Sequence, residues 1–332
     1  MKLYQPSYYE QFQCLAGACP DSCCQEWDVQ VDEVAAARYL ALSGPLGEDL
    51  RQKLKQEDGE YYLQIVERRC PMWRSDGLCR IQAELGEGAL CTVCREFPRL
   101  RHDYGDFVEL GLELSCPEAA RLIFSTAPAP WVEREMPGDE PAGYDRLDME
   151  ILLRTRKKAL DILEQYSFAD AMALLLLYGY RAQAELDGGE AEPWEPQGEL
   201  ALARRAAIPG DWALLRKFYA ELEILTPRWE KLLEAAPSHS AFPEKLLRMV
   251  RCNIERYWLQ AISDLDLVGR VKMILAAALL VGHLGGDPVV TAQLYSKEID
   301  NSIDNVETIL DAAYTHPALT DRHLLGLITT LY

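Results

Sequence analysis

Cysteine placement constrains this chain more than any other feature of its sequence. Nine of the ten cysteines lie between Cys14 and Cys116, and the rest of the chain contains only Cys252. A fold that gathers so many thiols must either use them chemically or bury them as small apolar groups. The first third of the chain therefore carries its most unusual chemistry.

The clustered cysteines form two groups with different spacings. The first group is Cys14-x4-Cys19-x3-Cys23-Cys24. The second group is Cys70-x8-Cys79-x11-Cys91-x2-Cys94-x21-Cys116. A short spacing such as Cys91-x2-Cys94 brings two soft ligands to one metal. The adjacent side chains of Cys23 and Cys24 are expected to point in different directions, so they are poorly placed to bind one ion together. They could bind two different centres, or one could be a ligand and the other a packing residue.

Charge and composition favour a reducing compartment for these thiols. The net charge of −19 argues against a nucleic-acid binder and against docking on an anionic membrane. The longest uncharged apolar run, Met273 to Leu284, is too short to span a membrane, and MKLYQPSYYEQF lacks the apolar core of a signal peptide. We therefore expect a cytoplasmic protein, in which clustered cysteines are more often metal ligands or catalytic thiols than disulfides.

The thiols predict a metal centre, with an iron–sulfur cluster favoured over zinc. The candidate ligands are Cys14, Cys19, Cys23, Cys24, Cys70, Cys79, Cys91, Cys94 and Cys116. One centre of four cysteines leaves five spare thiols, and two centres leave one. The spacing does not match a zinc ribbon, although zinc needs only tetrahedral thiolates and remains an alternative. Inert buried thiols are a third interpretation, disfavoured by their number in one region.

Arginines follow the second cysteine group in an otherwise acidic chain. Arg95, Arg99 and Arg101 lie within the seven residues that follow Cys94. Guanidinium groups there would offset the negative charge of a thiolate-bound cluster, or bind a carboxylate or phosphate of a ligand. We therefore expect these three arginines at a cofactor-binding site, with ordinary surface arginines as the alternative.

Hydrophobic periodicity predicts a mainly α fold in three parts. A small Cys-rich, metal-stapled α+β portion (1–125) is followed by a Pro-rich extended connector without regular structure (126–143) and a larger all-helical body (144–332). Asp32 is predicted to cap a helix that ends near Gly44-Pro45, a charged helix is expected at 46–58, and strands are expected at 61–67 and 107–114. Later helices are predicted at 209–235, 242–262, 266–284, 288–314 and 319–332. Strands and helices do not alternate, so no parallel-sheet fold is expected.

The order of the cysteine motifs resembles a known family. FQCLAGACPDSCCQEWDVQVDE, CPMWRSDGLCRI, CTVCREFPR and SCPEAARL together resemble the flagellin lysine N-methylases, the FliB family, related to the YkgJ-type zinc- or iron-chelating proteins. The resemblance covers residues 1 to about 125. It implies methylation of lysine ε-amines on flagellin by S-adenosylmethionine, in a protein carrying an iron–sulfur cluster of the 4Fe–4S type.

The residues themselves indicate a metal more directly than methyl transfer. Gly188-Gly189 and Gly285-Gly286 lack the strand–helix context of a Rossmann methyltransferase, and the radical S-adenosylmethionine motif C-x3-C-x2-C is absent. Two other functions stay open. One is an iron–sulfur or zinc module in electron transfer, and the other is a structural adaptor folded by zinc.

Methyl transfer would require a site that accepts a proton from the lysine amine. Four acids, Glu26, Asp28, Asp32 and Glu33, follow the first cysteine group. We expect a cleft between the cysteine region and the helical body, with some of these acids at its mouth. The alternative for Asp32 and Glu33 is a helix N-terminus, where the macrodipole favours acids.

Overall fold

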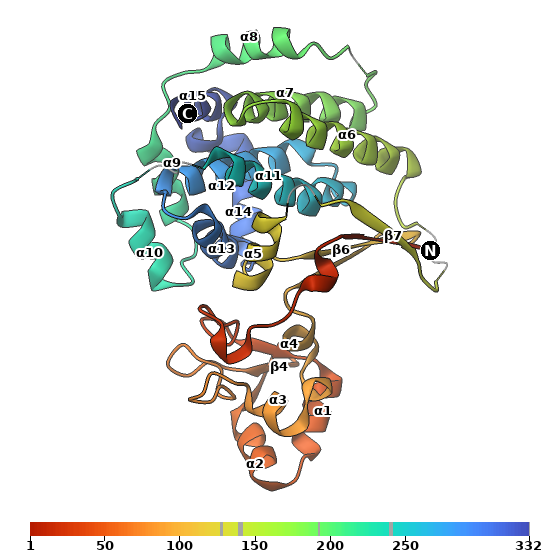
Figure 1. Ribbon diagram of the computed structural model, residues 1–332, viewed down its shortest axis with the longest axis vertical. Helices are drawn as coiled ribbons and strands as arrows, with labels where there is room; N and C mark the ends of the chain where they lie inside the picture. Colours follow the sequence, from red (N-terminus) through yellow and green to blue (C-terminus); the bar gives the residue numbers. More distant parts are fainter. Residues whose placement is uncertain (127–128, 139–141, 192, 239–241, 332) are drawn as a thin grey trace.

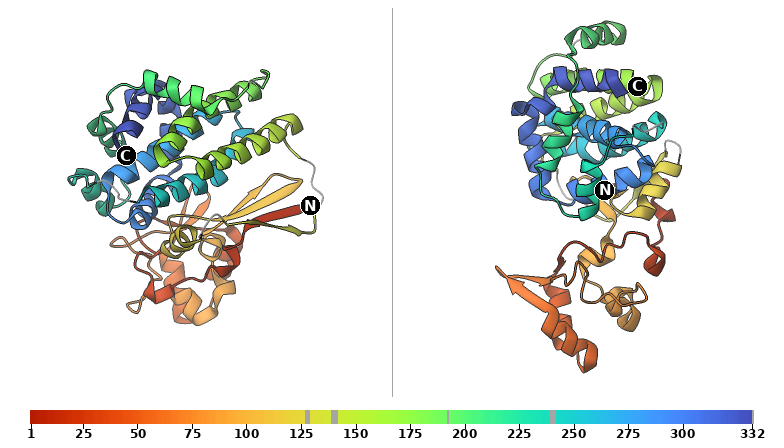
Figure 2. Two further views of the ribbon diagram at one scale, coloured as in Figure 1. Left: turned by 45° about the horizontal axis from the view of Figure 1, so that its top comes forward. Right: turned by 90° about the vertical axis from the view of Figure 1, so that its left-hand side faces the viewer.

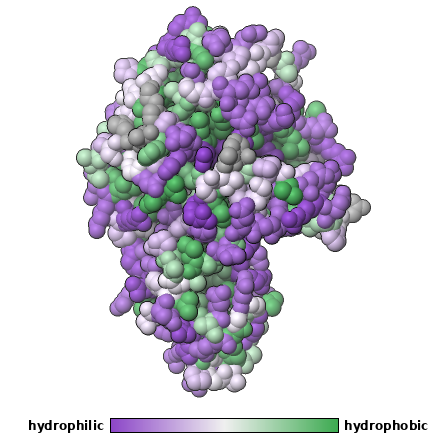
Figure 3. Space-filling model, in the orientation of Figure 1, coloured by the Kyte–Doolittle hydropathy of each residue, from purple (hydrophilic) through white to green (hydrophobic). Residues whose placement is uncertain are grey.

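A large helical body and a smaller lobe make up the molecule (Figure 1). The computed structural model describes residues 1–126, 129–138, 142–191, 193–238 and 242–331. The small part projects from one side of the body, and the right-hand view in Figure 2 shows the same separation. We call residues 13–96 the cysteine lobe. The face drawn in Figure 3 is largely hydrophilic, with scattered apolar patches on both parts.

Helices dominate the body, as predicted for a mainly α fold. They are α5 (Pro117–Ser125), α6 (Arg146–Gln165), α7 (Phe168–Leu186), α8 (Pro196–Ala206), α9 (Trp212–Ala220), α10 (Pro227–Glu234), α11 (Pro243–Tyr257), α12 (Leu267–Leu284), α13 (Pro288–Ile299), α14 (Ile303–Thr315) and α15 (Asp321–Leu331). Short 3-10 helices lie at Tyr9–Gln11, Ala16–Ala18, Glu87–Ala89, Trp258–Ile262 and Pro317–Leu319.

Two predicted long helices, 209–235 and 288–314, were wrong because each is two helices. Thr226 caps α10 by accepting a hydrogen bond from the amide of Trp229, and Pro227 takes the first helical position. Ser302 caps α14 in the same way, accepting from the amide of Asn305. In both places the capping residue begins a new helix, although the apolar spacing continues without a break through the sequence.

Helix α12 forms the centre of the body. All of its residues are buried, and it packs against α7, α11 and α14. Within the described part of the chain, it is the one helix long and apolar enough to cross a membrane, with a mean hydropathy of 1.7. Its complete burial among other helices identifies it as a core helix of the body.

A four-stranded mixed sheet adjoins the body, in the order β5-β6-β1-β7. Its strands are β1 (Lys2–Pro6), β5 (Arg99–Asp103), β6 (Phe107–Leu112) and β7 (Trp131–Glu135). The strand predicted from the apolar alternation at 107–114 is confirmed as β6. Leu3 pairs in parallel with Val108 and antiparallel with Arg134, so the first strand lies between two much later ones.

The predicted connector, 126–143, contains regular structure, which corrects the expectation of none. Strand β7 lies within it at the edge of the sheet, between Pro130 and Pro137. An edge position tolerates flanking prolines because one side of the strand needs no partner. Residues 127–128 and 139–141 of this segment lie outside the described residues.

Two separate hydrophobic cores divide the chain differently from the predicted three parts. The small core draws its buried residues from Val29 to Cys91, inside the cysteine lobe. The large core includes Tyr8, Phe12 and Phe107 together with the helices of the body. Residues 1–12 and 99–125 therefore pack with the body, because β1 and β6 are strands of one sheet and α5 packs against α13 and α11.

The cysteine lobe has its own small α+β fold. A three-stranded sheet in the order β2-β4-β3 packs with short helices: β2 (Val29–Val31), β3 (Leu54–Glu57), β4 (Glu60–Leu63), α1 (Glu33–Ala41), α2 (Gly44–Lys53), α3 (Arg80–Leu85) and α4 (Thr92–Glu96). Asp32 caps α1 as predicted, since its Oδ1 accepts from the amide of Ala35 at 2.9 Å. The helix predicted at 46–58 ends at Lys53, and the strand predicted at 61–67 ends at Leu63, where pairing with Val29 and Leu54 stops.

Candidate metal centre

The thiols are all free, and most of the clustered ones lie inside the lobe. Five of them belong to the small core: Cys24, Cys70, Cys79, Cys91 and Cys94. A backbone hydrogen bond from the amide of Cys70 to the carbonyl of Cys24, 2.8 Å long, joins the first cysteine group to the second. The two groups therefore meet in space, as expected of a centre that draws ligands from both.

Helix N-termini carry three of the clustered cysteines. Cys79, Cys91 and Cys116 are the N-cap residues of α3, α4 and α5. The amides of a first helical turn lack partners in the helix, and they favour a thiolate over a thiol. Burial raises the pKa of Cys79, and the amides of Gln82 and Ile81 act against that rise. A metal ligand must be a thiolate, so these positions suit ligation.

Two pairs of thiols interact closely. The thiol of Cys94 lowers the pKa of Cys91, and the thiol of Cys23 lowers the pKa of Cys24. The same contacts, together with burial, raise the pKa of Cys94 and of Cys23. One thiol of each pair is therefore easier to deprotonate than the other, and a metal ligand must be a thiolate.

The remaining thiols lie where the lobe meets the body. Cys14 accepts from the amide of Ala16 at 3.4 Å, and Cys19 donates to the carbonyl of Asp21 at 3.4 Å. Cys116 is buried at the start of α5 in the large core. The first cysteine loop therefore packs against the body as well as against its own lobe.

Asp21 fixes the position of this loop. Its Oδ1 lies 2.6 Å from the Nζ of Lys297, and its Oδ2 accepts from the Nε2 of Gln293 at 2.9 Å. The same Gln293 amide donates to the carbonyl of Ser115 at 2.7 Å. One side chain of α13 thus holds the Cys19–Cys23 loop beside the residue that precedes Cys116.

Sequence reasoning did not find Lys297 or Gln293. Lys297 is 2% exposed and its Nζ lies 5.1 Å from the ring centroid of Trp27. The available signal was a charged Lys297-Glu298 pair inside the otherwise uncharged helix α13. Charged residues are almost never fully buried without a partner, so such a pair marks an internal contact.

The donor set fits a thiolate-ligated metal. Clustered free thiols, helix-terminal amides and partial burial are the features that stabilise soft ligands. Within the described ranges, no three His, Cys, Asp or Glu side chains converge closely enough to form a complete metal-ligand set. The metal and its ligands therefore remain predictions that rest on the chemistry of the donors.

The three predicted cofactor-binding arginines lie on α4 and β5. Arg95 pairs with Glu96 at 2.9 Å, and Arg101 pairs with Asp103 at 2.8 Å. The guanidinium of Arg99 lies 5.1 Å from the ring centroid of Phe12. Their cofactor role stays a prediction, and two of the three already have a carboxylate neighbour.

The acids after the first cysteine group have structural partners. Asp32 also accepts from the amide of Thr92 at 2.8 Å, which joins α1 to α4. Asp28 accepts from the amide of Ile65 at 2.7 Å, and Glu26 forms an ion pair with Arg68. Glu33 lies in the first turn of α1. The alternative of a helix N-terminus is therefore confirmed for Asp32 and Glu33.

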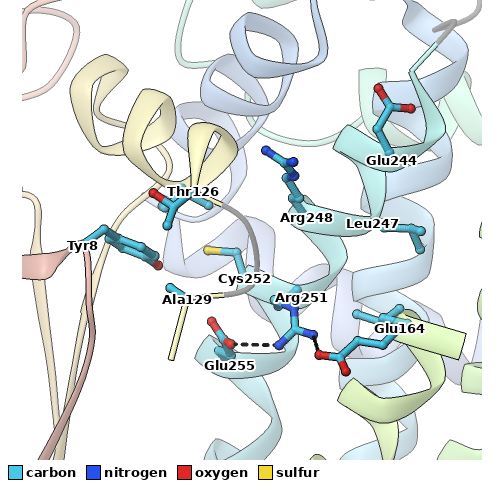
Figure 4. Close-up of a pocket in the computed structure, with 12 residues that line it drawn as sticks. Tyr8, Thr126, Ala129, Glu164, Glu244, Leu247, Arg248, Arg251, Cys252 and Glu255 are labelled. Atoms are coloured by element: carbon cyan, nitrogen blue, oxygen red, sulfur yellow. Dashed lines mark hydrogen bonds and ion pairs between the residues drawn. The ribbon is translucent and has the colours of Figure 1, made fainter. Parts of the chain in front are cut away.

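Cys252 lies apart from the other thiols. It is buried on α11 and borders a cavity of about 290 Å³ that is also lined by Tyr8 (Figure 4). Arg251 lies beside it and pairs with Glu164 at 2.6 Å and Glu255 at 3.7 Å. Its position in the large core gives this cysteine a packing role.

Comparison with known proteins supplies what the geometry alone does not. The flagellar biosynthetic protein FliU of Salmonella muenchen is 34% identical over 128 residues, a match that covers 36% of this chain and 76% of FliU. The chain belongs to the flagellin lysine N-methylase (FliB) family.

Two other members of the FliB family match at the same identity. The proteins named Lysine-N-methylase from Salmonella typhimurium and Salmonella choleraesuis are 34% identical over 128 residues, which is 32% of each. The match thus spans about a third of these relatives. No family model matches the chain, and no solved structure matches it. The link to YkgJ-type proteins remains a prediction.

Proposed function

We propose that this chain methylates lysine ε-amines of flagellin, using S-adenosylmethionine and an iron–sulfur cluster held in the cysteine lobe. The observation that carries the proposal is the match to two proteins named Lysine-N-methylase. The name of FliU, a flagellar biosynthetic protein, supports a flagellar substrate. A reducing compartment keeps clustered thiols free, so we also propose that the enzyme acts in the cytoplasm.

Charge supports a lysine-bearing substrate. With a net charge of −19, the molecule attracts basic segments and speeds their encounter with its surface. The unperturbed pKa of a lysine ε-amine is about 10.4, so the amine must lose a proton before it attacks a methyl group. Burial of the amine in the enzyme lowers that pKa, because an apolar site disfavours the charged form.

Cysteines of the lobe are the proposed holders of the cluster. Cys14, Cys19, Cys23, Cys91 and Cys94 are the strongest candidates, and Cys24, Cys70, Cys79 and Cys116 are the others. When bound, the cluster would supply the binding site for the methyl donor, and these cysteines would hold the cluster in place. The protein limits the access of water, since Cys70, Cys91 and Cys116 are buried.

The proposal is tested with anaerobically purified protein, flagellin and S-adenosylmethionine. We expect bound iron and sulfide, and methylated lysines in the mass spectrum of flagellin. Cys19→Ala and Cys94→Ala should each lower metal content and abolish methylation. Cys252→Ala is the matched control, because it removes a buried thiol that lies outside the cluster, and it should change neither property.

Three outcomes would overturn the proposal. Full methylation by a metal-free variant would make the cysteines structural. Iron without any methylation would favour the electron-transfer module. Zinc without binding of S-adenosylmethionine would favour the adaptor.

A further inference from the structure

We propose that the nine clustered cysteines hold two separate metal centres rather than one. The core centre draws its ligands from the small core of the lobe: Cys24, Cys70, Cys79, Cys91 and Cys94. The junction centre lies where the lobe meets the body: Cys14, Cys19, Cys23 and Cys116. The inference rests on the proposed function for the presence of metal, and it adds the number of centres and their placement.

Packing within the lobe defines the core group. All five of its cysteines contact the small hydrophobic core and none belongs to the large one. The amide of Cys70 bonds to the carbonyl of Cys24, and the amide of Arg80 bonds to the carbonyl of Met72, both at 2.8 Å. These two links bring the segments around Cys24, Cys70 and Cys79 together. Cys91 and Cys94, at the start of α4, pack against the same small core.

Contacts with α13 define the junction group. Asp21 lies two residues from both Cys19 and Cys23, and Ser115 directly precedes Cys116. Gln293 donates to Asp21 and to Ser115, so both segments lie against one amide group. The junction group is thus assembled by the body, through residues that play no part in the small core.

Adjacent Cys23 and Cys24 mark the division between the two groups. The carbonyl of Cys24 accepts the hydrogen bond from the amide of Cys70, which places Cys24 with the core group. Cys23 lies two residues after Asp21, whose carboxylate is held by Gln293 and Lys297 of α13, which places Cys23 with the junction group.

Ligand arithmetic also fits two centres. A thiolate-bound zinc or a cubane iron–sulfur cluster takes about four cysteines. The junction group has four, and the core group has five, which leaves one spare thiol. One centre alone would leave five thiols clustered in or beside the lobe without a role, although clustered reduced cysteines are prone to oxidation.

A junction centre would join the two parts of the molecule. Cys14, Cys19 and Cys23 belong to the lobe, whereas Cys116 begins α5 in the body. A metal shared between them would add to the Asp21–Lys297 pair as a link across the junction. The core centre, in contrast, would stabilise the lobe alone.

The test begins with the metal and sulfide content of the anaerobically purified full chain. We expect the content of two centres, and full reconstitution should not exceed it. Replacing Cys91 and Cys94 together by alanine (the core variant) leaves three core thiols and should remove the core centre. Cys116→Ala (the junction variant) leaves three junction thiols and should remove the junction centre, so each variant should retain about half of the wild-type metal. Combining the two variants should leave almost none, and the Cys252→Ala control should retain all of it.

A second measurement separates a lost centre from a misfolded protein. Circular dichroism should show nearly unchanged helix content in the core variant and in the junction variant, because most helices belong to the large core. Limited proteolysis between lobe and body, near Phe97-Pro98, should be faster in the junction variant than in the core variant. Equal cleavage of the two variants would overturn the placement of the junction centre.

Other results would overturn the number of centres. The proposal of two centres would be overturned if the wild-type protein held only one centre after full reconstitution, or if the folded core variant or the folded junction variant lost all of its metal. These readouts do not include methylation, so the two proposals fail separately. If the protein holds two centres but does not methylate flagellin, only the proposed function is contradicted. If it methylates flagellin with a single centre, only the present inference is contradicted.

Discussion

Lys297 and Asp21 form an ion pair of 2.6 Å across the junction of the body and the cysteine lobe, and the lysine is 2% exposed. Their contact places the first cysteine loop against α13, next to the segment that leads into Cys116. A buried ion pair tolerates the loss of one partner poorly, since the other charge is left without compensation.

Replacement of Lys297 by methionine should therefore destabilise the docked lobe. We expect a loss of about 3 kcal/mol in the free energy of unfolding, because Asp21 would keep its charge without a partner. Lys217→Met is the control, since Lys217 is 74% exposed and lies 3.7 Å from Glu221, and it should change stability by less than about 0.5 kcal/mol. Urea denaturation measures both, and equal losses would contradict the structural role of Lys297.

Gly77 should be required for the close packing of the two cysteine loops. Its φ is +81°, and a Cβ at this position would lie 3.0 Å from the Cα of Gly17. Gly77→Ala should therefore cost roughly 2–3 kcal/mol, from backbone strain and overpacking together.

Gly59→Ala isolates the contribution of strain. Gly59 has a φ of +90° but an added Cβ would meet nothing within 4 Å. Its replacement should cost roughly 1 kcal/mol. Thermal unfolding of the two variants measures the difference, and equal melting temperatures would show that the contact between the loops contributes nothing.

His102 should make the body less stable in mild acid. Burial lowers its pKa below 6.5, Arg256 and Arg156 lower it further, and Glu109 partly opposes them. The Nε2 atom is buried without a hydrogen-bond partner. The folded protein therefore resists the proton that the unfolded chain accepts, so stability is unaffected above pH 6.5 and falls as the pH drops below it.

His102→Gln should remove this part of the pH dependence. Between pH 7.5 and pH 5.5 the free energy of unfolding of the wild type should fall by up to about 1.4 kcal/mol more than that of the variant. The limit is about 1.4 kcal/mol because pH 5.5 lies about one unit below the pKa of histidine in the unfolded chain. Urea midpoints at the two pH values measure the change. An identical pH dependence in both proteins would contradict a neutral buried ring.

Arg156 should be essential to the junction of the sheet and α6. It makes two hydrogen bonds to the carboxylate of Glu109, at 2.7 and 2.5 Å, and both side chains are largely buried. Arg156→Met should cost about 3–5 kcal/mol, because Glu109 would remain charged inside the protein.

Arg154→Met is the control on the same helix. Arg154 is 55% exposed and pairs with Glu185, so its loss should cost no more than about 1 kcal/mol. Replacing both members of the buried pair, with Arg156→Met and Glu109→Gln, should recover part of the stability lost in Arg156→Met. A single variant as stable as the wild type would show that the pair contributes nothing.

Local signals predicted the parts of the fold that depend on nearby residues. The N-cap at Asp32 was predictable because its hydrogen bond goes to Ala35, three residues away. Strand β6 was predictable because its apolar residues alternate. Strand β1 was not, since LYQP has little pattern of its own and forms a strand only by pairing with residues more than a hundred positions later.

In the candidate site, too, features that depend on nearby residues were predictable and features that depend on distant residues were not. Spacing predicted which cysteines lie near one another, because the members of a short motif are close in sequence. It did not reveal that Cys116 is placed by α5, or that Lys297 and Gln293 hold the first loop. Those contacts join residues from opposite ends of the chain, and only tertiary packing brings them together.

The pairing of β1 with β6 and β7 also sets an order of events during synthesis. Strand β1 leaves the ribosome before its neighbours β6 and β7, which emerge only after the entire cysteine lobe. The small core and the cysteines packed against it, from Cys24 to Cys94, form one contiguous segment that can fold as soon as it has emerged. With the two proposed centres, the five core thiols would acquire metal on the nascent chain before the sheet closes, whereas Cys116 arrives later with α5.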